Sequence, residues 1–234
     1  MTTVSSEERP SPISPRRLPI TVRGAGRYEV LLILLASVLV LAPFLTTVLE
    51  PVIVALLGGI LVYALWTSLA ASMLVWLAAG LSVACVATSA IAPIWADSSR
   101  TAYALASIVL SVAAIASIAV HLTQRRTATS ATLAGAIAVY LLVGLTFADL
   151  FLCLAEVTGV AYFSQTASPD SVAYLYYSFT TLTTVGFGDL TAGTDLGRML
   201  AVVEALLGQL YLVTVVAVIV ATRRPRTIAT REEG

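Results

Sequence analysis

Five consecutive residues have the composition of a backbone strand that binds cations: Thr184, Val185, Gly186, Phe187 and Gly188. Glycine adopts backbone angles that other residues resist, so two glycines alternating with larger residues let successive carbonyl oxygens point the same way. Four copies of such a strand would form stacked rings of oxygens that replace the water shell of a potassium ion. The Thr184 hydroxyl can add the innermost ring. The segment therefore predicts a cation selectivity filter.

A short apolar segment, Ser171–Thr183, precedes this strand and must position it. Ser168, Pro169 and Asp170 predict a helix start there, with serine at the cap and proline in the first turn. About 13 residues make a helix of roughly 20 Å, too short to cross a bilayer core of about 30 Å. Irregular backbone at membrane depth must be buried in protein or line a watery path. The negative end of this helix would then favour a cation beside the strand.

The rest of the chain has the composition of a membrane protein. Of its 234 residues, 59% are hydrophobic, 11% are charged, and the net charge is zero. Soluble domains carry about a quarter charged residues and have too small a core to bury so much apolar surface. Zero net charge argues against a nucleic-acid partner. One histidine and two cysteines leave little for a metal site or a disulfide scaffold.

The apolar segments predict six membrane-spanning helices. Five apolar segments reach the length of about 20 residues that a span requires: Tyr28–Leu49, Val52–Ala96, Thr101–Thr123, Ala131–Ala155 and Leu196–Thr222. The second is long enough for two spans, joined by a turn that we expect at Ser68–Ser72. The predicted fold class is an all-α membrane protein with six transmembrane helices, and with a re-entrant pore helix and selectivity filter between spans five and six.

The arginines select this topology and its orientation. All 13 basic residues are arginines. Six spans with a cytoplasmic N-terminus place only Arg100 and Arg198 on the outer side of the membrane. Five spans would divide them almost evenly, so the positive-inside rule favours six. We therefore expect an integral protein of the cell membrane with both termini in the cytoplasm. The topology divides the chain into a flexible cytoplasmic tail at 1–27, a four-helix transmembrane region at 28–123, a pore module at 131–222 and a cytoplasmic tail at 223–234.

The string TLTTVGFGDLTAGTDLGRML resembles the signature of the potassium channel pore-loop family, whose filter reads TVGYG. The resemblance covers roughly residues 131–222. It implies passive potassium permeation, without enzymatic activity, cofactor or small-molecule ligand. It also implies that the potassium-coordinating oxygens come from the first four filter residues and that Asp189 lies at the outer mouth.

Tyr176 and Tyr177 match the aromatic pair that buttresses the filter in members of this family. The chain departs from the family at two places. Phe187 lacks the hydroxyl of the usual tyrosine, and Thr180 stands where some members carry a glutamate behind the filter. Both departures bear on the stiffness of the filter, so a less selective monovalent cation channel of the same fold is the alternative.

The chain offers one filter strand, and a ring around an ion needs four, which predicts a homotetramer with fourfold cyclic symmetry. Thr101–Val120, the predicted fourth span, contains no charged residue, whereas voltage sensors carry arginines there. We therefore expect a channel that is not voltage-gated, whose first four helices form a lipid-facing collar or sense lipid, tension or a ligand. A carrier would show paired repeats, and an enzyme would need a cluster of titratable residues.

Two residues of the last predicted span have two interpretations each. Glu204, an ionisable group at membrane depth, is expected either to brace the pore helix from behind or tune filter gating, or to be a hydrogen-bonded packing residue near the pore helix. Gly208 is a hinge or a site of close helix packing. Asp149 and Glu156 are expected to be interfacial residues or partners of Arg198, and the alternative is that they are part of the ion path.

Overall fold

The computed structural model describes residues 25–45, 58–59, 62–63, 80, 96–124, 129–166 and 169–222. These residues form helices with short connections, and the β-structure among them is one isolated bridge, between Phe163 and Ala192. The longer helices are α1 (Ala25–Leu45), α4 (Ala96–Gln124), α5 (Ser130–Thr158), α6 (Ser171–Leu182) and α7 (Asp195–Tyr211). The prediction of an all-α protein is confirmed for this part of the chain.

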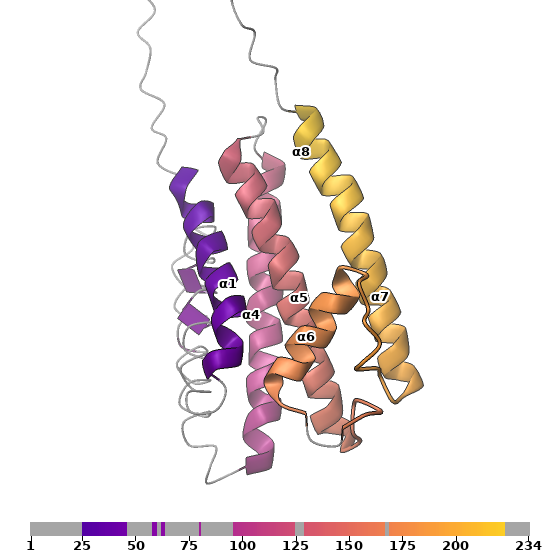
Figure 1. The fold of residues 1–234 in the computed structure, drawn as a ribbon. Helices are drawn as coiled ribbons and strands as arrows, with labels where there is room; N and C mark the ends of the chain where they lie inside the picture. The colour runs from indigo at the N-terminus through magenta and orange to yellow at the C-terminus, as the bar shows by residue number, and fades with distance from the viewer. Residues whose placement is uncertain are drawn as a thin grey trace, which may run out of the picture.

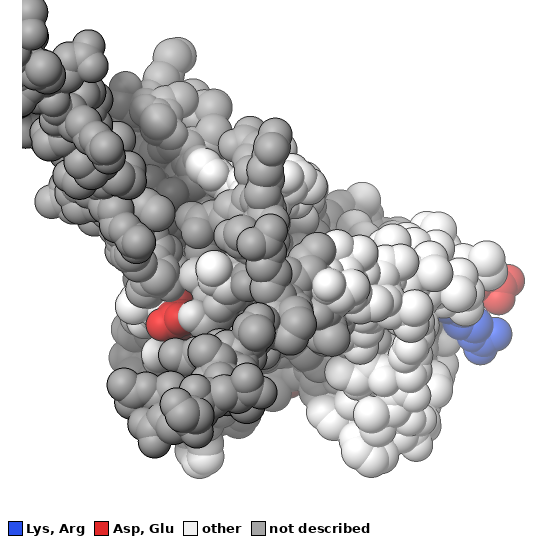
Figure 2. All heavy atoms as spheres, turned by 90° about the horizontal axis from the view of Figure 1, so that it is seen from above, with Lys and Arg blue, Asp and Glu red and all other residues white. Residues whose placement is uncertain are grey.

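Three of these helices are long and apolar enough to cross a membrane. The three spans within the described residues are Ala104–Thr123, Ser130–Thr158 and Asp195–Val215, and α1 contains a shorter apolar stretch, Tyr28–Leu41. Viewed from above, nearly all the described surface is uncharged (Figure 2). The three spans match three of the six predicted spans, and α1 overlaps a fourth, Tyr28–Leu49. Most of Val52–Ala96, including the expected turn at Ser68–Ser72, lies outside the described residues, so the count of six stays a prediction.

The last helix is continuous from Asp195 to Thr222 but changes its winding. A π-helical segment, η2 (Leu212–Val216), separates α7 from α8 (Ala217–Thr222). Just before it, the Tyr211 hydroxyl donates a hydrogen bond of 2.7 Å to the Ala136 carbonyl of α5. The predicted span Leu196–Thr222 therefore contains a local irregularity that neither proline nor glycine marks in the sequence.

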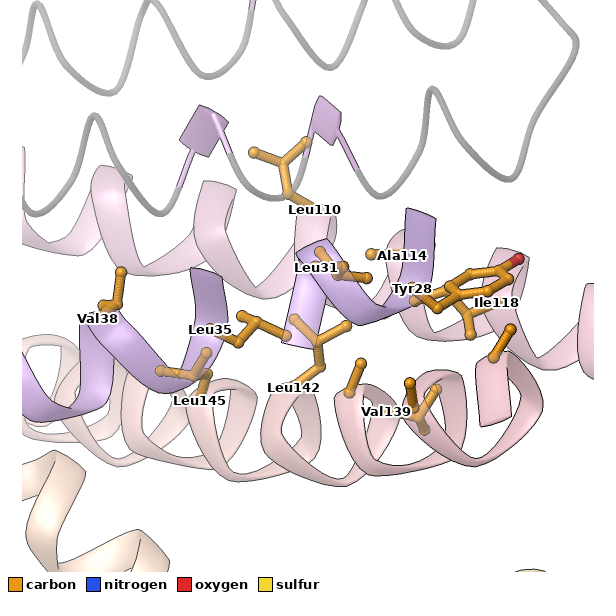
Figure 3. Packing of buried hydrophobic residues seen from close by; sticks show 13 residues of the cluster. Tyr28, Leu31, Leu35, Val38, Leu110, Ala114, Ile118, Val139, Leu142 and Leu145 are labelled. Atoms are coloured by element: carbon orange, nitrogen blue, oxygen red, sulfur yellow. The ribbon is translucent and has the colours of Figure 1, made fainter. Parts of the chain in front are cut away.

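An apolar core joins α1, α4 and α5 (Figure 3). Leu31 and Leu35 of α1 and Leu142 of α5 have no exposed surface. Small residues on α4 and α5, including Ala114 and Ala138, lie in the same cluster. Small side chains let helix backbones approach closely, which stabilises helix pairs in lipid where the hydrophobic effect does not. This three-helix layer supports the elements that carry the predicted filter.

Helix α6 turns back alongside α5, and the segment after it returns to the end from which α6 began, where α7 starts (Figure 1). Its first residue is Ser171, and its N-cap is Asp170, whose side chain accepts a hydrogen bond of 2.8 Å from the Ala173 amide. The prediction of serine at the cap and proline in the first turn is therefore wrong. An aspartate at the N-cap satisfies a free amide and also places a negative charge at the positive end of the helix dipole.

Candidate functional site

Two glycines let α6 fit between α5 and α7. A Cβ atom built on Gly144 of α5 would lie 2.7 Å from the Cζ of Phe179. A Cβ atom built on Gly208 of α7 would lie 2.3 Å from the Leu182 carbonyl oxygen. Any side chain at either position would push α6 away. The packing interpretation of Gly208 thus has a direct structural basis, and Gly144 plays a part that the sequence analysis missed.

The predicted filter segment, residues 184–188, alternates in backbone conformation. Thr184, Gly186 and Gly188 have φ angles of 59°, 48° and 78°, whereas Val185 and Phe187 between them have no positive φ. Alternation between residues with and without positive φ lets successive carbonyls turn the same way. A β-branched residue at positive φ is a steric outlier, with a cost of about 1–3 kcal/mol. Strain of this kind clusters at functional sites, which favours the interpretation of 184–188 as a functional strand.

The C-terminal end of α6 holds the start of this strand. The Thr184 amide donates to the Thr181 carbonyl over 2.9 Å, and the Gly186 amide donates to the Thr180 carbonyl over 3.0 Å. The predicted filter segment is therefore attached to the end of α6 at which the helix dipole is negative. Thr180 contributes through its backbone, while its hydroxyl donates to the Tyr177 carbonyl.

A glutamine that the sequence analysis did not single out also contacts the predicted filter segment. The Gln209 Nε2 atom of α7 donates a hydrogen bond of 2.9 Å to the Thr184 hydroxyl, which itself donates to the Thr183 carbonyl over 2.7 Å. The hydroxyl expected to form the innermost ring is thus oriented by α7. No spacing in the sequence distinguishes Gln209 from an ordinary polar residue of a span.

The two adjacent tyrosines of α6 have different surroundings. The Tyr176 hydroxyl donates to Asp189 Oδ2 over 2.9 Å, and its ring stacks on Phe187 with centroids 6.2 Å apart. Tyr177 points elsewhere and is buried among aromatic rings of α5 and the segment after it. Its ring partners are Phe151, Tyr162 and Phe163. Tyr176 thus contacts Phe187 of the predicted filter segment through its ring and the following Asp189 through its hydroxyl.

The chain beyond the filter is held by the segment that follows α5. The Ser164 amide donates to the Thr191 carbonyl over 3.0 Å, and the Gly193 amide donates to the Tyr162 carbonyl over 2.8 Å. The Tyr162 hydroxyl donates to the Gly197 carbonyl over 3.3 Å. Burial raises the pKa of Tyr162, so its phenol stays a neutral donor. These bonds hold residues 191–197, which follow the predicted filter segment, to the connection between α5 and α6.

Two acidic residues near ends of the spans, Asp195 and Asp149, have different surroundings. Asp195 forms an exposed ion pair with Arg198 at 3.6 Å, and the Arg198 Nε atom also donates to the Ala192 carbonyl. Asp149 of α5 accepts a hydrogen bond from Ser107 of α4. The structure therefore pairs Asp149 with Ser107 and not, as one interpretation had it, with Arg198. The Ser107–Asp149 bond links the α4 layer to α5.

Glu204 lies on the face of α7 that contacts α6, and its side chain has no exposed surface. Its carboxyl group forms a hydrogen bond with Ser178 of α6, whose hydroxyl also contacts the Gly144 carbonyl. The described residues contain no group of three or more His, Cys, Asp or Glu side chains that could hold a metal ion.

A family model described as "Ion channel" matches residues 127–223, which is the part of the chain from α5 through α8. The matched range coincides with the predicted pore module at 131–222. It includes α6, the filter segment and the two spans that flank them. No curated protein and no solved structure matches the chain. The match supports an ion channel domain in this part of the chain, within a membrane protein.

Proposed function

We propose that the chain is the subunit of a potassium-selective channel, which conducts passively through a homotetrameric pore in the cell membrane. The observation that carries this proposal is the alternating backbone of 184–188, with positive φ at Thr184, Gly186 and Gly188. Ion channels select potassium by rings of backbone carbonyls that replace its hydration shell. A threonine held at positive φ between two helices is hard to explain as an ordinary surface loop.

The surroundings of the strand fit this chemistry. The carbonyls of Thr184, Val185, Gly186 and Phe187 would coordinate the ion, and the carbonyl end of α6 would favour its positive charge. Gln209 would orient the Thr184 hydroxyl from behind. At the other end, Tyr176 would hold Asp189 at the outer mouth. The protein supplies oxygens and shape, and no bond is made or broken.

The exposure of the strand supports a tetramer. Val185 is 56% exposed and Phe187 is 70% exposed in one subunit. Irregular backbone with unpaired carbonyls at membrane depth must be buried in protein or line a watery path. Three further copies around a central axis would cover the side chains and surround the ion with the carbonyls. The outward face of α7 is also apolar and exposed, at Leu196, Met199, Val202, Val203, Leu206 and Leu210.

The deciding experiment measures reversal potentials of the reconstituted full chain in planar bilayers, with potassium on one side and sodium on the other. Selective conduction gives a potential near the potassium equilibrium value. A potential near zero with robust currents would favour the alternative, a less selective monovalent cation channel. Phe187, which stacks on Tyr176 but has no hydroxyl to bond it, is the residue that favours that alternative.

Two glycine variants make the test specific to the filter. Gly186 and Gly159 both have positive φ, at 48° and 64°, and a Cβ atom on either would meet nothing within 4 Å. Gly186→Ala and Gly159→Ala therefore introduce similar backbone strain, but Gly159 only caps α5. We expect Gly186→Ala to abolish conduction or potassium preference and Gly159→Ala to preserve both. Unchanged selectivity in Gly186→Ala would show that 184–188 is not the filter.

A further inference from the structure

Three helices meet at the hydroxyl group of Ser178. Ser178 lies on α6 with no exposed surface, and its Oγ atom is 2.7 Å from the Gly144 carbonyl oxygen of α5. The same Oγ atom is within hydrogen-bond distance of Glu204 Oε1 of α7. All three groups are buried, so solvent water does not compete for these contacts. The junction lies within two residues of Thr180, whose carbonyl holds the filter amide of Gly186.

The number of protons at this junction decides the state of Glu204. A serine hydroxyl carries one proton, and a backbone carbonyl can only accept. An ionised carboxylate can also only accept. With Glu204 ionised, one proton would have to serve two acceptors in different helices. With Glu204 protonated, its carboxyl group donates to Ser178 Oγ, Ser178 donates to Gly144, and both contacts are full hydrogen bonds.

The second carboxyl oxygen of Glu204 also indicates that the carboxyl group is protonated. Glu204 Oε2 is buried and has no hydrogen-bond partner among the described residues. An unpartnered oxygen is far less costly on a neutral acid than on a buried carboxylate. The titratable groups that face Glu204 are the phenols of Tyr140 on α5, Tyr162 before α6 and Tyr177 on α6. Arg198, on α7 itself, pairs with Asp195 and offers Glu204 no charge.

We propose that Glu204 is a neutral carboxylic acid whose proton closes a hydrogen-bonded link from α7 through Ser178 to α5. When alkaline solution removes that proton, the Ser178 hydroxyl can donate to Gly144 or to Glu204 but not to both, so the link opens. Glu204 is then a positioning residue, because it acts on the filter only through α6. The proton state does not depend on the proposed function, but its effect on conduction does.

Infrared spectroscopy tests the proton state directly. The full chain in lipid vesicles is measured at neutral pH as wild type, Glu204→Gln and Asp195→Asn. We expect the carbonyl band of a protonated carboxylic acid in the wild type, its loss in Glu204→Gln and its retention in Asp195→Asn, which removes an exposed acid from the same helix. The band should disappear as the pH is raised. A wild-type spectrum without a band that depends on Glu204 would overturn the proposal.

A second variant, Ser178→Ala, keeps the test decisive if Glu204→Gln fails to fold. Ser178→Ala removes the acceptor but leaves the acid, so the band should persist and move to the frequency of a less strongly hydrogen-bonded acid. An unmoved band would show that Glu204 does not donate to Ser178 and would overturn the link.

Potassium flux from the same vesicles tests the consequence for the filter. Flux through the wild type should be lost as the pH rises, whereas flux through Glu204→Gln, whose amide donates to Ser178 at every pH, should not change. An equal loss in both proteins would overturn the coupling to the filter. Absence of flux in both at neutral pH would count against the proposed function, while the infrared result would still decide the state of Glu204.

Discussion

The α-carbon of Gly208 lies against the carbonyl oxygen of Leu182, so closely that a methyl group on Gly208 would lie 2.3 Å from that oxygen. Leu182 is the last residue of α6 and has no exposed surface. The Tyr140 hydroxyl of α5 donates to the same carbonyl over 3.2 Å. The end of α6 is thus enclosed between α5 and the backbone of α7, two residues before the filter begins.

Gly208→Ala should destabilise the protein, because the added methyl group meets a backbone atom that cannot rotate away. Overpacking of this kind costs roughly 1–3 kcal/mol. The measurement is the thermal unfolding of the full chain in mild detergent. Trimming the neighbour by Leu182→Ala should not rescue the variant, since the carbonyl remains. Unchanged stability combined with an altered open probability would instead support the hinge interpretation of Gly208.

Gly144→Ala offers the matched contrast on α5. Its methyl group would lie 2.7 Å from the ring of Phe179, a side chain and not a backbone atom. We expect a destabilisation of similar size, about 1–3 kcal/mol, that Phe179→Leu partly reverses by making room. Thermal unfolding of the two single variants and the double variant measures this. Strictly additive effects would mean that Phe179 does not limit the space at Gly144.

The features that depend on residues close together in the chain could be predicted from the sequence. The apolar segments predicted the helices that the structure describes, and alternating glycines predicted a strand with unusual backbone angles. Helix geometry explains why adjacent Tyr176 and Tyr177 differ, since neighbours in a helix do not share a face. Contacts between helices were not predictable in this way. The pairing of Ser107 with Asp149 and the fit of Gly144 to Phe179 depend on the rotation of each helix about its axis.

Thr184 and Gln209 should be energetically coupled, because the glutamine amide donates to the threonine hydroxyl. Thr184→Val keeps the branched shape and removes the hydroxyl, while Gln209→Leu removes the amide. Each single substitution should lower the stability of the folded protein by about 0.5–1.5 kcal/mol, because it removes one hydrogen bond. In a double-mutant cycle the second change should cost little once the first is made. Potassium-dependent thermal stability is the readout, and additive losses would mean that the bond contributes nothing to the filter.

Conductance should change only shallowly with voltage. Residues Thr101–Val120 of α4 carry no charged side chain, so this segment has no arginine series that could carry gating charge across the membrane. One elementary charge crossing the membrane contributes about 2.3 kcal/mol per 100 mV, and steep gating needs several charges per subunit. Conductance–voltage curves from planar bilayers provide the measurement. A steep sigmoidal curve would contradict this view of α4.

Potassium should stabilise the assembled protein. The filter carbonyls of one subunit can surround an ion only beside three others, so an ion bound between them stabilises the tetramer and not the monomer. Binding to one state alone adds RT ln(1 + [L]/Kd) to its stability, about 2.7 kcal/mol at a hundredfold excess over Kd. We expect a tetramer in native mass spectrometry and a dissociation temperature that rises more with potassium than with sodium. Gly159→Ala should keep this preference, and Gly186→Ala should lose it while its subunits still associate. Monomers or dimers under conditions that preserve ion flux would contradict the tetramer, because one or two filter strands cannot enclose a desolvated ion.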